Sequence, residues 1–129
     1  MNYALSMLML LAINLDSVIS VREIAQRQNV PYAFARSIQR DLIKAGLTTT
    51  KFGVTGGVLL AREPESITLY DIVTAIHGDT TYLSREVPHS HDMPDEHSHN
   101  SWVHPIWAEA DQVVTEFLKS KKLTDLLLT

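Results

Sequence analysis

Signals for the start and end of helices lie close together between residues 20 and 46, and they restrict the fold more than any other feature. The tetrapeptide Ser20–Glu23 has the pattern of a capping box, in which serine and glutamate side chains satisfy free amides at a helix start. Asn29 tolerates the left-handed conformation of a turn, and Pro31 suits the first turn of a second helix. Gly46 is typical of a helix end. This order predicts two short helices joined by a tight turn.

The second of these helices has an apolar stripe and a basic side. Its apolar residues recur at spacings of three and four, which predicts one buried face made of Ala35, Ile38, Leu42 and Ala45. Arg36 and Arg40 lie away from that stripe and are four residues apart, so they share a face of the helix. Ser37 and Gln39 add neutral hydrogen-bonding groups nearby.

Two β-like segments follow, over residues 47–51 and 58–61, and the glycine-containing stretch 52–57 between them indicates a tight hairpin turn. An apolar helix is expected before this unit, over residues 3–15, and a second capping box predicts a helix over 68–76. The fold class predicted is therefore mainly α with a small β-wing, a winged helix-turn-helix followed by a long C-terminal dimerisation helix.

The formal net charge of −4 conceals a strong asymmetry along the chain. Residues 1–62 carry seven basic and three acidic side chains, whereas residues 63–129 carry four basic and twelve acidic ones. A basic half beside an acidic half indicates that one end of the protein meets a polyanion. Cysteine is absent, which excludes disulfides and a thiol redox switch and is compatible with the cytoplasm. The apolar run 4–15 is too short to span a membrane.

A helix, a turn, a helix and a wing in this order predict contact with double-stranded DNA, with the second helix of the pair in the major groove. Arginines four residues apart can address adjacent groups on DNA, and the glycines of the wing allow backbone amides to approach phosphates. The candidate DNA-binding residues are Ser20, Arg22, Tyr32, Arg36, Ser37, Arg40, Lys51, Gly53 and Thr55.

Other interpretations compete with DNA binding. The arginine pair could be a solvated helix face, and a winged helix can also dock on a protein partner and regulate it. An enzyme is not expected, because no scaffold holds the Ser, His and Asp residues in catalytic geometry. A metal-dependent hydrolase is the enzymatic alternative, and it would lose turnover on chelation.

Five of the six histidines lie between residues 79 and 104, in a segment predicted to be a loop. Two H-x-H pairs can each present two imidazoles on one side of an extended chain. Imidazole with nearby carboxylates suits divalent zinc, nickel, copper or iron, so a metal-sensing site is our hypothesis. The alternatives are a flexible linker, a pH-responsive element and adventitious metal binding. The candidate ligands are His89, His91, His97, His99 and His104.

Pro105 is expected to open a final amphipathic helix, because apolar residues recur from there at helical spacing. An apolar stripe of that length would be a liability on a monomer, so we expect a homodimer. The candidate dimer residues are Trp107, Val114, Phe117, Leu118 and Leu126. The chain is thus divided into a DNA-binding domain (1–78), a His-rich loop (79–104), and a dimerisation helix with an apolar tail (105–129).

Several short motifs, taken in order, resemble the Rrf2 family of bacterial transcription regulators. They cover nearly the whole chain: Tyr3-Ala-Leu5, Ile24-Ala25, Ala45-Gly-Leu47, Gly56-Gly57, Leu60-Ala61, Ile67-Thr-Leu-Tyr-Asp-Ile-Val73, Trp107 and Leu123-Thr-Asp-Leu126. The resemblance implies a cytoplasmic homodimer that binds a palindromic operator, usually to repress transcription. It also implies that some relatives act through a protein partner.

The sequence departs from the family at three informative places. Phe52 stands where relatives carry an arginine before the wing glycine, and Arg36 stands where a glutamate is common. Relatives that bind an iron–sulfur cluster place three cysteines before the final helix, and Ser101 aligns with the last of these. His104 aligns with a histidine that completes the cluster site in one branch. A conventional iron–sulfur cluster is therefore not expected.

Overall fold

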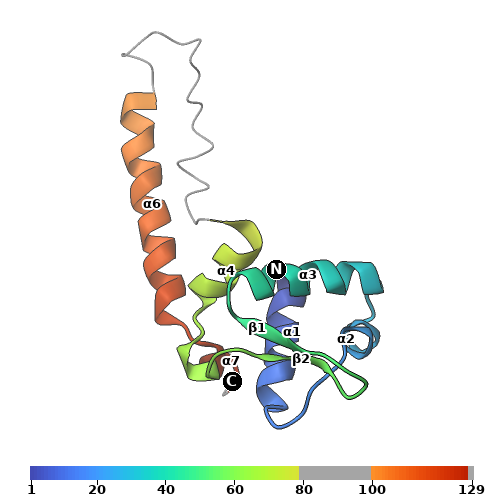
Figure 1. Cartoon of the computed structure of the whole chain (residues 1–129). Coiled ribbons are helices and arrows are strands. Elements are labelled where there is room, and N and C mark those ends of the chain that lie inside the picture. The colour runs from blue at the N-terminus through green and yellow to red at the C-terminus, as the bar shows by residue number, and fades with distance from the viewer. Residues whose placement is uncertain (79–99, 128–129) are drawn as a thin grey trace.

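The structure, a computed structural model, describes residues 1–78 and 100–127. Figure 1 shows a compact body, made by α1 to α4 and the hairpin, and one long helix, α6, whose C-terminal end lies beside the body and whose N-terminal part projects beyond it. The elements are α1 (Asn2–Ile13), α2 (Val21–Gln28), α3 (Tyr32–Lys44), β1 (Thr48–Lys51), β2 (Gly57–Leu60), a 3-10 turn η1 (Pro64–Ser66), α4 (Leu69–His77), α6 (Asn100–Ser120) and α7 (Leu123–Leu127). The predicted fold class, a helical protein with a small β-wing, is confirmed.

Local capping chemistry sets the ends of α2 and the start of α4. The Ser20 hydroxyl accepts a hydrogen bond from the Glu23 amide at 3.0 Å, so half of the first predicted capping box is present. The other half is wrong, because the Glu23 carboxylate accepts from Arg27 one turn further along the helix, at 2.9 Å. Asn29 ends α2 in the left-handed conformation, with φ of 54°. The capping box at the start of α4 is complete.

The wing is an antiparallel hairpin in which β1 pairs with β2 from Thr48 opposite Leu60 to Lys51 opposite Gly57. A further β-bridge joins the wing to the segment before α2, because the amide and carbonyl of Val58 both bond to Ile19, at 2.7 and 3.2 Å. Gly57 permits this approach, since a Cβ there would lie 2.7 Å from the Ile19 carbonyl oxygen. The hairpin is therefore attached to the helical body at its base.

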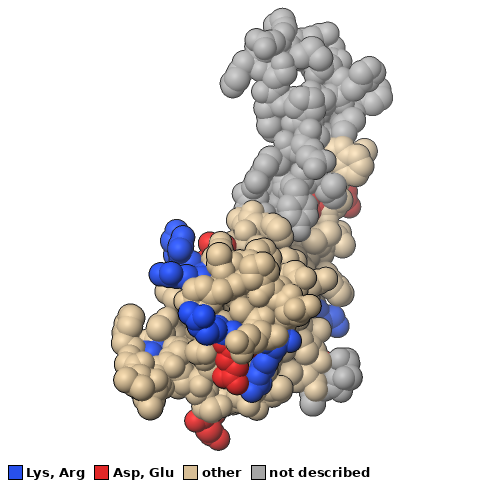
Figure 2. Space-filling model, turned by 90° about the vertical axis from the view of Figure 1, so that its right-hand side faces the viewer, with Lys and Arg blue, Asp and Glu red and all other residues tan. Residues whose placement is uncertain are grey.

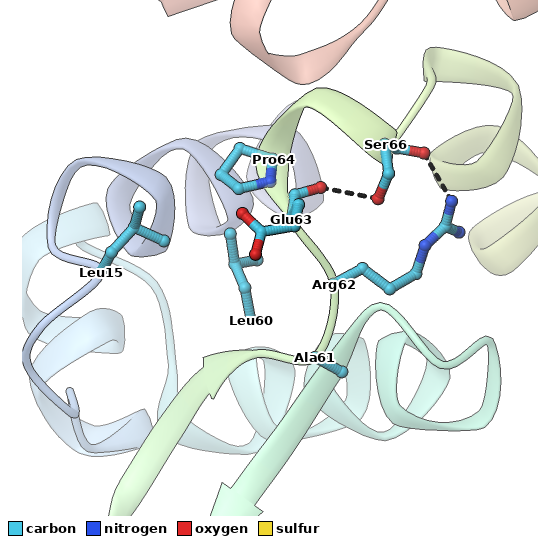
Figure 3. A pocket seen from close by; sticks show the side chains of 7 residues that line it. All are labelled: Leu15, Leu60, Ala61, Arg62, Glu63, Pro64 and Ser66. Carbon is cyan, nitrogen blue, oxygen red and sulfur yellow. Dashed lines mark hydrogen bonds between the residues drawn. The ribbon is translucent and has the colours of Figure 1, made fainter.

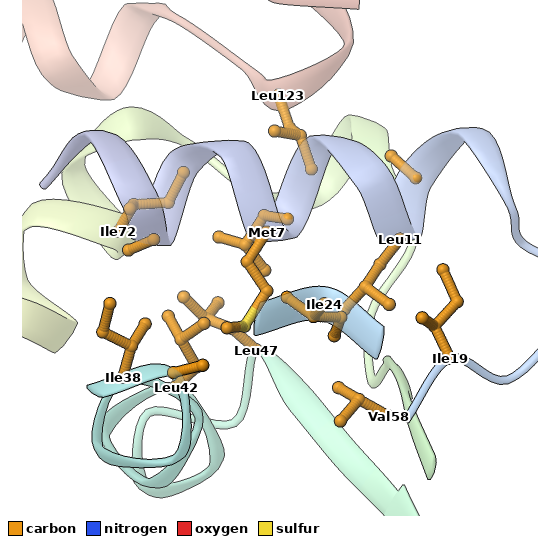
Figure 4. Close-up of a cluster of buried hydrophobic side chains, with 14 of the residues drawn as sticks. Met7, Leu11, Ile19, Ile24, Ile38, Leu42, Leu47, Val58, Ile72 and Leu123 are labelled. Carbon is orange, nitrogen blue, oxygen red and sulfur yellow. The ribbon is translucent and has the colours of Figure 1, made fainter. Parts of the chain in front are cut away.

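The hydrophobic core lies where α1, α2, α3 and α4 meet the base of the wing, and Figure 4 shows its side chains converging from these elements. Met7, Leu42 and Leu47 are fully buried at its centre. Ala35, Ile38 and Leu42 are buried as the helical spacing predicts. Ala45 is exposed, so the predicted stripe ends one turn early, because α3 stops at Lys44 and the chain turns there.

Truncation of a central core residue gives a direct test of this packing. Leu42→Ala is expected to lower the free energy of unfolding by about 2–5 kcal/mol, because it leaves a cavity among side chains that have no exposed surface. Urea denaturation at fixed protein concentration measures the change. Ile13→Ala is the control, since the Ile13 side chain is 67% exposed and should change stability by only about 0.5 kcal/mol. Equal effects of the two substitutions would contradict the described core.

The long helix α6 begins at Asn100, five residues before the predicted start, and contains Pro105 in its second turn. Proline lacks an amide hydrogen, so α6 gives up one hydrogen bond near its start without ending there. The segment predicted as a loop therefore contributes its last residues to a helix. After α6, the Leu69 amide bonds to the Lys121 carbonyl and the Leu123 amide bonds to the Ile67 carbonyl, at 2.9 and 2.8 Å. This bridge holds α7 against the body.

Within the described residues, no helix is long and apolar enough to cross a membrane.

Candidate nucleic-acid interface

The exposed side of α3 carries two arginines that have no hydrogen bond or ion pair with any described residue. Arg36 and Arg40 are both exposed and lie one helical turn apart, as the spacing predicts. Ser37 is exposed beside them. Unpaired guanidinium groups with five donors each are suited to phosphate oxygens and to the acceptor atoms of guanine.

The beginning of α2 lies against the beginning of α3. The guanidinium carbon of Arg22 lies 4.9 Å from the ring centre of Tyr32, a cation–π contact that holds both side chains near the surface. Tyr32 is 41% exposed and is the first residue of α3. The Ser20 hydroxyl accepts a hydrogen bond from the Glu23 amide, so its O–H donor and one lone pair remain for an external group. These three predicted residues extend the basic surface of α3 toward α2.

A shallow groove connects α3 with the wing strand β1. It is lined by Val21, Tyr32, Arg36, Gln39, Arg40, Ile43 and Thr50. Because Thr50 belongs to β1 and the rest belong to α2 and α3, a ligand on α3 would also meet the wing.

Gln39 does not belong to the exposed face, contrary to the interpretation from the sequence. It is buried, and its side-chain oxygen accepts a hydrogen bond from the Thr48 hydroxyl at 3.0 Å. This bond connects α3 to the first residue of β1 and so fixes the wing relative to the helix. Helical spacing signals this burial, because Gln39 follows Ala35 by four residues and precedes Leu42 by three. Only its partner is unsignalled, because Thr48 becomes a neighbour through the turn at Gly46.

The predicted wing residues Lys51, Gly53 and Thr55 are all exposed. Gly53 has a φ of 111°, which requires glycine, and its carbonyl accepts a hydrogen bond from the Gly56 amide at 3.0 Å to close the turn. Two apolar residues of the same turn, Phe52 and Val54, were not among the predicted contacts and are almost entirely exposed.

Figure 2 shows the side of the molecule on which α2 and α3 lie in Figure 1. Lys and Arg side chains are spread across this face, with fewer acidic side chains between and below them. The acidic net charge of the whole chain is therefore no obstacle to polyanion binding at this surface.

A second hollow lies at the base of the wing, lined by Leu15, Leu60, Ala61, Arg62, Glu63, Pro64 and Ser66 (Figure 3). Its only basic group is already engaged, because Arg62 donates to the Ser66 carbonyl and to the Asp71 carboxylate. This arginine ties the end of the wing to the start of α4, which is a structural role.

The predicted dimer residues fall on two sides of the protein. Trp107, Val114 and Leu118 share one face of α6, because they recur at spacings of seven and four; Trp107 is 39% exposed and the other two are half buried. Phe117, which is 56% exposed, lies on an adjacent face. Leu126 packs against the core of its own chain. Ile106 and Val113 are also exposed and share a helix face with Phe117, because the three recur at spacings of seven and four.

The candidate metal ligands His89, His91, His97 and His99 lie outside the described residues. His104 belongs to α6. Among the described residues, no group of three or more His, Asp or Glu side chains is arranged to hold a metal ion. The metal-sensing hypothesis stays a prediction.

A helix-turn-helix with an exposed arginine pair, continued by a hairpin, defines a winged-helix DNA-binding protein. The chain belongs to the Rrf2 family, whose model, described as "Iron-dependent Transcriptional regulator", matches residues 1–129. It is 30% identical over 115 residues to protein rrf2 of Nitratidesulfovibrio vulgaris, which covers 87% of this chain and 73% of that protein. The family resemblance predicted from short motifs is confirmed.

Solved structures of the same family share the fold. CymR, the global cysteine regulator of B. subtilis, superposes with a TM-score of 0.74 at 27% identity, covering 97% of this chain and 90% of that one. IscR of T. potens superposes with a TM-score of 0.73 at 26% identity, covering 98% and 81%. These relatives are transcription regulators and not enzymes, so the chain is a DNA-binding transcription regulator.

The iron in the family description does not fit this chain as a cysteine-ligated cluster. Such clusters are held by thiolates, and the sequence contains no cysteine.

Proposed function

We propose that the protein is a homodimeric, sequence-specific regulator that represses transcription by occupying a palindromic operator. The observation that carries the proposal is the exposed pair Arg36 and Arg40 on α3, one turn apart and unpaired among the described residues, beside a wing that is fixed to the same helix. Two unpaired guanidinium groups on a helix of this size match the major groove in both charge and spacing.

Each part of the basic surface has a distinct role in this proposal. Arg36 and Arg40 contact base edges and adjacent phosphates, and Ser37 supplies a neutral donor between them. Arg22 and Tyr32 contact the backbone at the start of α3, where Ser20 also offers its hydroxyl hydrogen. Lys51, Gly53 and Thr55 contact the flanking backbone from the wing.

The outer stripe of α6, which we define as Ile106, Val113 and Phe117, forms the dimer interface in this proposal. Their side chains are 62%, 61% and 56% exposed, although they recur at the spacing of a buried helix face. Trp107 borders the stripe on the neighbouring face of α6, which it shares with the half-buried Val114 and Leu118. Two helices packed through this stripe would bury apolar surface that a monomer leaves in water.

Selection of bound duplexes from random-sequence DNA by the purified full chain tests the proposal. The expected product is an inverted repeat whose half-sites lie one helical turn, or a multiple of it, apart, because a two-fold dimer presents two copies of α3. Selection of no consensus, or recovery of a single asymmetric site, would contradict the dimeric operator. Affinity for the selected duplex that is no higher than for random DNA would contradict sequence-specific regulation.

The response to a signal is assigned in this proposal to the His-rich segment, as a site for a divalent metal in the bacterial cytoplasm. The support is the residue chemistry alone: imidazoles in H-x-H pairs among carboxylates. The same operator-binding measurement, repeated with zinc, nickel and copper, is expected to give a changed affinity. Unchanged affinity at saturating metal would contradict the sensing role and leave DNA binding intact.

A further inference from the structure

The tip of the wing presents two apolar side chains that no described residue covers. Phe52 is 89% exposed and Val54 is fully exposed, more than any other large apolar residue in the described part of the chain. The two residues are separated only by Gly53, so they project from one short turn. Burial of a phenylalanine side chain contributes about 1.5–3 kcal/mol of free energy, and this contribution is lost while Phe52 stays in water. A ligand that covers Phe52 would recover it.

The turn that carries these side chains is fixed by its backbone. The Gly56 amide bonds to the Gly53 carbonyl, and a Cβ on Gly56 would overlap the Lys51 carbonyl, so the chain can close here only with glycine. The base of the hairpin is held by the Ile19–Val58 bridge. Phe52 and Val54 therefore project from an anchored hairpin. Because the backbone of the turn is already ordered, it loses little conformational entropy on binding.

The wing tip is continuous with the basic face of α3. Thr50, two residues before Phe52, lines the same groove as Arg36 and Arg40, and Lys51 adds an exposed positive charge between Thr50 and the tip. If α3 lies in the major groove, the adjoining hairpin meets the next minor groove, which is about 6 Å wide. A phenyl ring cannot pair with phosphates there, but it can stack on bases or enter a step between them.

We propose that Phe52, supported by Val54, acts as an apolar wedge in the minor groove flanking each half-site and opens a base-pair step. This inference rests on the proposed DNA binding through α3. In this proposal the wing senses how easily the DNA deforms, because pyrimidine–purine steps unstack more easily than A-tracts. The flanking preference of the protein is then for a TA or CA step at the wedge and against a stiff A-tract.

Removal of the wedge is expected to lower the affinity for DNA by the same factor at every salt concentration. Phe52→Ala is expected to weaken binding to the selected duplex by about tenfold or more, since stacking of an aromatic side chain on a base contributes about 1–3 kcal/mol. The slope of log affinity against log salt should stay the same, because the variant neutralises the same number of phosphates. Phe52→Trp should preserve the affinity, and Ile13→Ala, outside the wing, is the control for removal of an exposed apolar side chain.

A base analogue reports the unstacking directly. With 2-aminopurine at the flanking step of the selected duplex, the wild-type protein is expected to raise its fluorescence, and Phe52→Ala is not. Replacing the flanking TA or CA step by an A-tract should weaken the wild type but not Phe52→Ala. Equal affinity of Phe52→Ala and wild type, with no fluorescence change for either, would overturn the wedge.

The outcomes separate this inference from the proposed function. If Phe52→Ala binds normally while Arg36→Ala/Arg40→Ala does not, the wedge is wrong and operator binding stands. If neither wild type nor variants prefer the selected duplex, the proposed function itself fails. If Phe52→Ala changes the sedimentation of the free protein and leaves DNA affinity unchanged, a protein surface covers the wing tip and the wedge is overturned.

Discussion

Arg36→Ala/Arg40→Ala is expected to weaken binding to the selected operator by about 100-fold or more, while the fold and the dimer persist. Each arginine that contacts a base edge or phosphate contributes about 1–3 kcal/mol, and a dimer loses both copies of the pair. Neither side chain makes a hydrogen bond or ion pair with any described residue, so their removal costs the folded protein little. Fluorescence anisotropy of labelled operator DNA measures the affinity, and circular dichroism confirms the fold.

A matched variant separates this contact from a general loss of positive charge. Lys119→Ala/Lys122→Ala removes two exposed charges near the end of α6, on the opposite side of the molecule from α2 (Figure 1). It is expected to change operator affinity by no more than about threefold, because exposed charges beyond about 10 Å are largely screened. If both double variants weaken binding equally, the assignment of α3 as the recognition helix is wrong.

Val113→Glu/Phe117→Glu is expected to convert the dimer to a monomer, raising the dissociation constant of the dimer by about 100-fold or more. The outer stripe would bury these positions in the dimer, and an unpaired carboxylate costs several kcal/mol to bury. In the monomer both side chains are more than half exposed, so the substitutions leave the core unchanged. Sedimentation velocity at micromolar protein measures the result, and operator affinity is expected to fall with it.

The control for this experiment is Lys119→Glu, which changes the net charge by the same amount. It lies on α6, where its ammonium group covers the ring of Tyr70 at 4.6 Å. It is expected to leave the dimer intact, because it is outside the outer stripe. Monomers from Lys119→Glu, or dimers from Val113→Glu/Phe117→Glu, would contradict the assignment of the interface to α6.

The features that are predictable from the sequence are those set by local chemistry. Thr68 with Asp71 closes a capping box through neighbouring backbone groups, and Gly46 and Gly78 end helices at positive φ. The positions of Arg36 and Arg40 on the exposed side of α3 follow from helical periodicity alone. These signals span at most one turn, so no tertiary contact is needed to interpret them.

The features that escape prediction depend on contacts between distant segments. The helical position of Gln39 places it on the buried stripe, but its polar side chain is tolerated there only because Thr48, on the next strand, bonds to it. The packing of Leu126 against the core depends on α7 folding back on the body, which no local signal in the sequence shows. The start of α6 is predicted too late because Pro105 is a common opening residue, whereas here the helix continues through it.

The candidate site is predictable in its basic part and not in its apolar part. Phe52 stands out in the sequence because relatives of the family carry an arginine there. Its solvent exposure cannot be predicted from hydrophobic periodicity, because it lies in a turn and not in a helix or strand. The tight turn made by the glycines at 53, 56 and 57 projects Phe52 and Val54 outward, and both are almost entirely exposed among the residues that the structure describes.

The central claim is that the arginine pair of α3 binds DNA, and the salt dependence of operator affinity tests it most directly. For the wild type, log affinity is expected to fall linearly with log salt, with a slope of about −0.9 for each neutralised phosphate. For Arg36→Ala/Arg40→Ala the slope should be shallower by about one for each phosphate that the variant no longer neutralises. Identical slopes and identical affinities for the two proteins would contradict the account.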